Sequence, residues 1–122
     1  QERQTKRAYQ FTSNKPVAEL LEGLGTALRD AQCEMKIFDQ NAKIKATTVT
    51  NSGMIGIVIQ VFGLTSNMRL VEIRRGKGDA LEYHRFFREL VTTRLRDTLN
   101  IPESQEFLNV FNLLPRNEGQ AT

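Results

Sequence analysis

The densest group of basic side chains in this sequence is Arg74, Arg75 and Lys77, which stand beside two glycines, Gly76 and Gly78. Glycine lets a chain reverse without a clash of its Cβ atom, so this spacing predicts a cationic turn. Such a turn can be a solvated corner, or it can bind an anion such as a lipid headgroup, to which each basic residue adds about 1 kcal/mol. The residues alone leave both interpretations open.

Side chains that usually carry catalysis are sparse. His84 is the only histidine, so a histidine metal cluster is excluded and a catalytic triad lacks support. Asp79 and Glu82 have the spacing of a capping box, in which both side chains bond backbone N–H groups at the start of a helix. The single cysteine, Cys33, alternates with Met35 and is expected to be a buried strand residue. We therefore predict no catalytic residue, no metal and no cofactor.

The net charge of +3 is concentrated in one part of the chain. Residues 69–96 contain eight basic residues against four acidic ones, so this window accounts for the whole excess. Two of the basic residues, Arg85 and Arg88, fall on a predicted helix and extend the candidate surface for contacts with lipid or a partner protein. A nucleic-acid interface is disfavoured because Glu82 and Glu89 interrupt the basic helix.

Hydrophobic periodicity predicts the elements that must position these residues. Apolar residues recur at steps of three and four over residues 17–31, which predicts an amphipathic helix capped by Ser13 or Asn14. The period then changes to two, which predicts four sequential strands. The strands are expected at residues 33–38, 42–49, 54–62 and 68–75. A second helix is expected over residues 80–99, with Asp79 as its N-cap.

The predicted fold is α+β, with two helices packed on one face of a four- to five-stranded antiparallel sheet in the order α-β-β-β-β-α. Short connections between sequential strands favour an antiparallel meander, since parallel pairs need long crossovers. Each helix has one apolar stripe, so both should cover the same face of the sheet. Residues 1–10 are expected to be a linker and residues 11–100 the domain. Residues 101–122 are expected to be an amphipathic tail, able to form a short helix or a docking segment.

Two segments carry a resemblance to a known family. Residues 78–87, with the sequence GDALEYHRFF, follow VEIRR at residues 71–75. Together they resemble the signature of the kinase-associated domain 1, which ends many serine/threonine kinases of the calmodulin-dependent-like group. Residues 11–16, FTSNKP, resemble the entry to this domain in plant calcineurin-B-like-interacting kinases and in checkpoint kinases. The resemblance covers residues 11–99 in element order.

The resemblance implies a non-catalytic regulatory module of a serine/threonine kinase, with a helix pair on a curved antiparallel sheet. Such a module can hold the catalytic domain inactive, contact acidic membrane lipid or dock a regulatory protein. Arg74, Arg75 and Lys77 are its lipid-facing candidates, and a stand-alone module for anionic phospholipid is the alternative. ATP chemistry would belong to an N-terminal part of the parent kinase, since this chain contains no kinase catalytic motif. The single cysteine, Cys33, cannot form an internal disulfide, which favours a reducing compartment, so we expect an intracellular location, in the cytoplasm or nucleus, or peripherally on a membrane.

Overall fold

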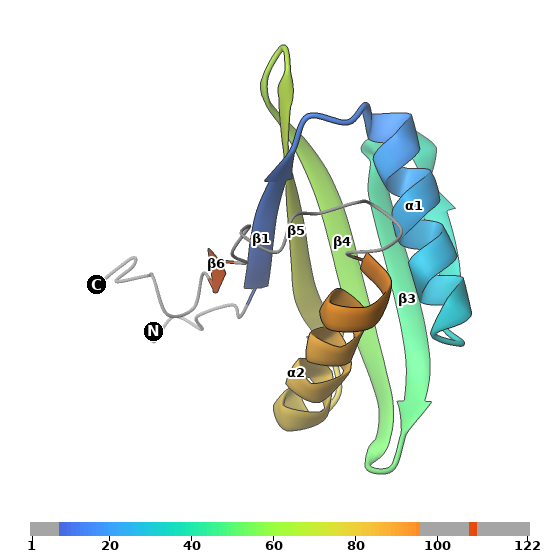
Figure 1. Ribbon diagram of the computed structural model, residues 1–122. Helices are drawn as coiled ribbons and strands as arrows, with labels where there is room; N and C mark the ends of the chain where they lie inside the picture. The colour runs from blue at the N-terminus through green and yellow to red at the C-terminus, as the bar shows by residue number, and fades with distance from the viewer. Residues whose placement is uncertain (1–7, 96–107, 110–122) are drawn as a thin grey trace, which may run out of the picture.

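One sheet and two α-helices make up most of the part of the chain that the computed structural model describes, residues 8–95 and 108–109. The strands are β1 (Ala8–Ser13), β2 (Glu34–Phe38), β3 (Lys43–Thr50), β4 (Gly53–Thr65), β5 (Met68–Lys77) and β6 (Leu108–Asn109). The α-helices are α1 (Val17–Asp30) and α2 (Ala80–Glu89), and the short elements are a 3-10 turn, η1 (Asp39–Asn41), and a π-helical turn, η2 (Leu90–Leu95). Figure 1 shows both α-helices on the same side of the sheet.

The sheet has the strand order β2-β3-β4-β5-β1-β6, and every neighbouring pair is antiparallel. Strands β2 to β5 form the predicted meander, with short turns between sequential neighbours. The α+β class and the packing of both helices on one face are therefore confirmed. In the described residues, neither helix combines the length and apolar character that crossing a membrane requires.

The prediction is wrong at the N-terminal end, because it lacks β1. Residues 8–10, expected within a linker, belong to a strand that lies between β5 and β6. Burial of Phe11, which pairs with Val71, gives the physical reason, since strand formation removes a large apolar side chain from water. The alternation of Tyr9 and Phe11 with polar residues is a strand signal, but the charged residues before it resemble a linker.

The start of α1 also differs from the prediction. Its N-cap is Pro16, which has an extended backbone and supplies no side-chain hydrogen bond to the helix. The hydroxyl of Ser13, one of the predicted caps, instead accepts a hydrogen bond from the backbone N–H of Lys15 (3.1 Å). Asn14, the other predicted cap, precedes Pro16 and is outside the cap position. Proline is favourable at a helix start because its fixed φ suits the first turn and its missing N–H has no partner there.

The core lies between the helices and one face of the sheet. Helix α1 packs over β2 and β3, and α2 packs over β4 (Figure 1). Ile44 pairs with Ile59, which pairs with Ile73, so a row of fully buried isoleucines crosses three strands beneath the helices. The buried apolar residues are Phe11, Leu20, Leu21, Leu24, Ala27, Leu28, Ile44, Ala46, Ile55, Ile57, Ile59, Val61, Val71, Ile73, Tyr83, Phe87, Leu90, Val91 and Leu95.

The predicted helix start at Asp79 is confirmed. The Asp79 carboxylate accepts a hydrogen bond from the backbone N–H of Glu82 (2.9 Å). The Glu82 carboxylate accepts hydrogen bonds from the Ser52 hydroxyl (3.3 Å) and the Arg85 guanidinium (3.2 Å). It is therefore engaged with its neighbours rather than with the backbone of Asp79, and only half of the predicted capping box forms.

The rest of the second helix is less regular than predicted. Helix α2 ends at Glu89, and η2 continues the chain as a π-helical turn to Leu95. Residues 96–99 lie outside the described residues, as does most of the predicted amphipathic tail, including any short helix there. The described part of the tail is β6, which pairs with β1. The tail therefore contributes a strand to the sheet.

An aromatic cluster attaches α2 to β1 and β5. The Tyr9 ring stacks on Phe87 with 3.8 Å between ring centroids, and its hydroxyl forms a hydrogen bond with Nδ1 of His84. The buried hydroxyl of Tyr83 donates to the backbone carbonyl of Ile73 (3.0 Å). Burial raises the pKa of Tyr83, so the hydroxyl stays protonated and can donate. These contacts give His84 a structural role.

The end of β5 contains a bulge and a glycine turn. The register between β4 and β5 shifts between Gly56 and Ile57, which leaves Gly76 as the extra residue of a β-bulge. Gly78 has a φ of +96°, and a Cβ atom there would lie 2.6 Å from the carbonyl oxygen of Met54. The turn that leads into α2 therefore requires glycine for both its backbone conformation and its close approach to β4.

Gly78→Ala should lower the free energy of unfolding by about 3 kcal/mol or more, because a left-handed backbone and a backbone clash act together. Gly53→Ala is the matched control, since Gly53 has a φ of +119° but open space where its Cβ atom would be. The control should lose only about 1–2 kcal/mol, the cost of the backbone conformation. Urea unfolding measures both losses, and equal values would show that the clash at Gly78 is negligible.

Candidate functional site

The face of the sheet opposite the helices, here called the open face, carries the candidate site. Side chains alternate between the two faces of a strand, so neighbours of buried core residues point away from the helices. Figure 1 shows both helices on the other side. The strand register and this alternation place five basic residues on the open face, which we call the open-face cluster: Lys36, Lys43, Lys45, Arg74 and Lys77.

Three of these cations lie in one row across the sheet. Lys36 on β2 pairs with Lys45 on β3. Lys45 in turn pairs with Val58 on β4, which pairs with Arg74 on β5. Like charges directly opposite each other in an antiparallel pair are destabilising. The Lys36–Lys45 pair therefore opposes folding, and an anion bound at this row would offset the repulsion.

Acidic and aromatic side chains share the open face with the cluster. Among the described strands the acidic residues are Glu34 and Glu72, and both fall on this face, so basic residues are in excess there. Phe38 and Phe62 are 37% and 43% exposed. The Nζ atom of Lys45 lies 5.9 Å from the centroid of the Phe38 ring, which is a cation–π distance. The face thus combines positive charge with exposed apolar surface.

The structure divides the predicted cationic turn. Arg74 and Arg75 lie within β5, as the predicted strand of residues 68–75 requires, but β5 continues to Lys77, so the turn begins two residues later than predicted and contains none of the three basic residues. The bulge at Gly76 brings Lys77 onto the same face as Arg74, and Lys77 lies over β4. Arg75 belongs to the other face, where its guanidinium donates a hydrogen bond to the backbone carbonyl of Gly78 (2.6 Å).

The two candidate cations of the second helix are in a different layer. Arg85 and Arg88 are exposed on α2, which packs on the opposite face of the sheet from the cluster. Arg85 also forms an ion pair with Glu82 (3.2 Å). The structure therefore does not bring these residues together with Arg74, and their role in binding stays a prediction.

Lys36, Lys43 and Lys45 are site residues that the sequence prediction missed. Their signal is an alternation in which lysines occupy every second position while apolar residues occupy the positions between them. This pattern shows that lysines share one face of their own strand. Only the pairing of β2 with β3 shows that the lysines of the two strands are neighbours.

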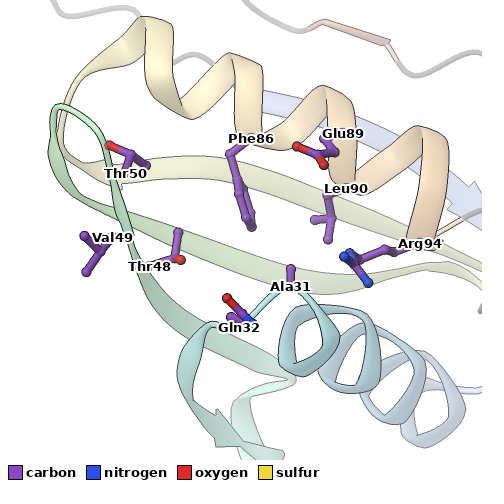
Figure 2. Close-up of a pocket in the computed structure, with 9 residues that line it drawn as sticks. All are labelled: Ala31, Gln32, Thr48, Val49, Thr50, Phe86, Glu89, Leu90 and Arg94. Carbon is purple, nitrogen blue, oxygen red and sulfur yellow. The ribbon is translucent and has the colours of Figure 1, made fainter.

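A cavity of about 200 Å³ lies on the helix side, between the end of α1, β3 and α2. Figure 2 shows Phe86 and Leu90 pointing from the helix toward the sheet, with Glu89 and Arg94 beside them. The lining residues include no histidine or cysteine. In the described part of the chain, no group of three His, Cys, Asp or Glu residues could hold a metal ion. The open face is therefore the stronger candidate site.

Cys33 lies one residue before β2 and is half-buried, so the prediction of a buried strand residue is only approximately met. Burial raises the pKa of the Cys33 thiol, and a hydrogen bond with Thr48 lowers it by a smaller amount. Because the thiolate is the nucleophilic form, this environment disfavours reaction at Cys33 near neutral pH.

Known proteins similar to this chain are plant kinases. CBL-interacting protein kinase 24 of Oryza sativa subsp. japonica is 31% identical over 87 residues, which are 70% of this chain and 19% of that kinase. The homologues of this chain are CBL-interacting protein kinases. CBL-interacting protein kinase 11 of the same plant is 24% identical over 112 residues, 91% of this chain and 22% of the kinase. CBL-interacting serine/threonine-protein kinase 16 of Arabidopsis thaliana is 31% identical over 88 residues, 71% of this chain and 19% of the kinase.

The chain spans about one fifth of the length of these CBL-interacting kinases. No protein-family model matches it. The similarity extends over most of this chain but over a short part of each kinase, so the chain corresponds to a kinase-associated regulatory segment rather than to a catalytic domain. This agrees with the resemblance to the kinase-associated domain 1.

Lys36→Glu should raise the free energy of unfolding by about 0.5–1 kcal/mol at low salt, because a pair of like charges becomes an ion pair with Lys45. The gain should shrink as the salt concentration rises. Arg69→Glu is the control, since Arg69 pairs with Ser13 and Gly63 and the same charge change there removes no opposed cation. Urea unfolding at low and high salt compares the variants. Equal effects of the two substitutions would show that the Lys36–Lys45 repulsion is negligible.

Proposed function

We propose that the chain is a non-catalytic regulatory module of a serine/threonine protein kinase and lowers the activity of the catalytic domain of that kinase. The observation that carries the proposal is the similarity to CBL-interacting protein kinases over most of the chain. The open-face cluster adds a surface on which basic residues outnumber the acidic residues of the same face. The module acts inside the cell, where the kinase and its substrates are.

The open face supplies the contact surface in this proposal. Its positive charge and its exposed phenylalanines, Phe38 and Phe62, suit a partner surface with an apolar centre and acidic residues around it. Contact with the catalytic domain holds the kinase in a low-activity state. An anionic lipid or a regulatory protein that competes for the same face shifts the population toward the active state, and a tenfold shift needs about 1.4 kcal/mol of differential binding.

The 122-residue chain, added in trans to the purified catalytic domain of its parent kinase, should lower the rate of peptide phosphorylation. A variant with Lys45→Ala, Arg74→Ala and Lys77→Ala should inhibit about tenfold more weakly, because each charge contact contributes roughly 0.5 kcal/mol. Kinase assays over a range of module concentrations give the inhibition constant of each chain.

The matched control removes three cations that lie away from the open face. It carries Lys15→Ala, which breaks an exposed ion pair with Glu19, together with Arg29→Ala on α1 and Arg69→Ala on β5. This variant should inhibit as well as the unsubstituted chain does. Failure of the unsubstituted chain to inhibit, at concentrations that saturate any useful affinity, would count decisively against the proposal.

Anionic membrane lipid is a second candidate ligand, favoured by the aromatic side chains beside the cations. Exposed phenylalanines can enter the boundary between headgroups and acyl chains, and each lysine or arginine near an anionic surface adds about 1 kcal/mol. In this alternative, the chain brings a kinase to the membrane without restraining its activity.

Vesicles that contain phosphatidylserine should sediment the chain at low salt, whereas vesicles of phosphatidylcholine alone should not. Arg74→Ala combined with Lys77→Ala should weaken binding roughly tenfold or more, because both residues belong to the open face. Arg75→Ala is the control and should bind normally, since Arg75 is on the other face and bonded to Gly78. Equal sedimentation by neutral vesicles, or a loss confined to Arg75→Ala, rules out the open face as a lipid site.

A further inference from the structure

The outer edge of β2 has no neighbouring strand in the described part of the chain, because β2 stands at one end of the sheet order. An edge strand presents backbone N–H and C=O groups to any extended chain that matches it. On β2 the side chains of Glu34, Lys36 and Phe38 belong to the open face. Met35 and Ile37 belong to the helix side, where Ile37 is still 38% exposed.

The two charges of β2 select the strand that can be added. Glu34 and Lys36 are both exposed, so a matching strand needs a basic residue opposite Glu34 and an acidic residue opposite Lys36. β2 itself meets this need when two copies pair antiparallel about Met35. Each Glu34 then lies opposite Lys36 of the other copy, twice over. Centring the pair on Glu34 or on Lys36 would oppose like charges, so charge favours the register centred on Met35.

The same register also relieves the repulsion within each sheet. Lys36 is the partner of Lys45 on β3, and Glu34 is the partner of Thr47. In the paired sheets each Lys36 would stand between Lys45 of its own copy and Glu34 of the other. The added carboxylate offsets the repulsion between the two lysines, and Glu34 gains a cation that its neighbour on β3 does not supply.

The helix side fits the same two-fold axis. Gly25 of α1 lies over β2, since a Cβ atom there would be 3.3 Å from Cδ1 of Ile37 and 3.6 Å from Cε of Met35. An axis through Met35 therefore passes near Gly25. Glu22 and Arg29 are both exposed on α1, one on each side of Gly25, and both line a cavity of about 400 Å³ between α1 and β2. The axis brings Glu22 of one copy toward Arg29 of the other.

Two further acidic residues, Asp30 and Asp39, are exposed near this edge. Asp30 ends α1 and Asp39 follows β2, so both lie at the rim, where salt screens their charges. The paired surface is small, because β2 has five residues and one helix lies beside it. The association is therefore expected to be weak and concentration-dependent.

We propose that the chain forms a two-fold symmetric dimer in which the β2 strands of two copies pair antiparallel about Met35. Main-chain hydrogen bonds join the two sheets, and the Glu34–Lys36 pairs fix the register. The axis is perpendicular to the sheet, so the open faces of both copies lie on the same side and present two open-face clusters together. The proposal does not depend on the function proposed above.

Sedimentation equilibrium of the 122-residue chain over a range of concentrations gives the dissociation constant of the dimer. Glu34→Lys and Lys36→Glu, tested separately, should each weaken the dimer about tenfold or more, because each substitution replaces two attractive pairs with two repulsive ones. Arg69→Glu is the control, since it makes the same charge change as Lys36→Glu on β5, and it should dimerise as the unsubstituted chain does.

Combining the two substitutions separates the register from a general effect of charge. A chain with both Glu34→Lys and Lys36→Glu should dimerise as tightly as the unsubstituted chain, because each acidic residue again faces a basic one. An equimolar mixture of the two single variants should associate more tightly than either variant alone, for the same reason. Unchanged dimerisation in both single variants, or no recovery in the combined variant, would exclude this register.

A disulfide bond gives an independent test. Met35→Cys, in a chain whose own thiol is removed by Cys33→Ser, should form a linked dimer in air, since directly opposite Cα atoms lie about 4.5–5.5 Å apart. Ile37→Cys in the same background is the matched control and should stay unlinked, because its two copies would be about 13 Å apart along the strands. Equal linkage in both variants, or a chain that remains monomeric at millimolar concentration, overturns the proposal.

Discussion

The burial of one face of the sheet beneath two helices is the constraint on which the rest of the structure depends. Each of the isoleucines in the row Ile44, Ile59 and Ile73 contributes roughly 1.5–3 kcal/mol by leaving water, whereas a pair of opposed like charges costs at most about 1 kcal/mol. Burial therefore sets the register. Once the isoleucines face the helices, the alternation of strand side chains forces Lys45 and its neighbours onto the other face.

Features encoded within a few residues could be predicted from the sequence. The meander of β2 to β5 follows from an alternation of period two, and the start of α2 follows from Asp79, whose carboxylate bonds the backbone three residues later. Features that depend on pairing between strands that are separate in the sequence could not be predicted in this way. The strand character of Phe11 becomes clear only beside Val71, and the charged row appears only when Lys36 and Lys45 are seen to be partners.

The cationic residues near the end of β5 illustrate the same limit. Two glycines among basic residues suggest a turn, because glycine is frequent in turns. In the structure Gly76 forms a bulge instead, and the bulge decides which face Lys77 occupies. A bulge moves a side chain from one face of a sheet to the other without changing the composition of the segment. Composition alone therefore could not separate Arg75 from its two basic neighbours.

The position of β1 has a consequence for how the domain folds and opens. β1 comes first in the described chain, yet it pairs with β5, and its Tyr9 bonds His84, 75 residues away in the sequence. Closing so long a loop has an entropy cost that the hairpins between β3, β4 and β5 do not share. The hairpins can therefore form before β1 is added. Local opening of this one strand would separate Tyr9 from Phe87 and loosen α2 while the meander persists.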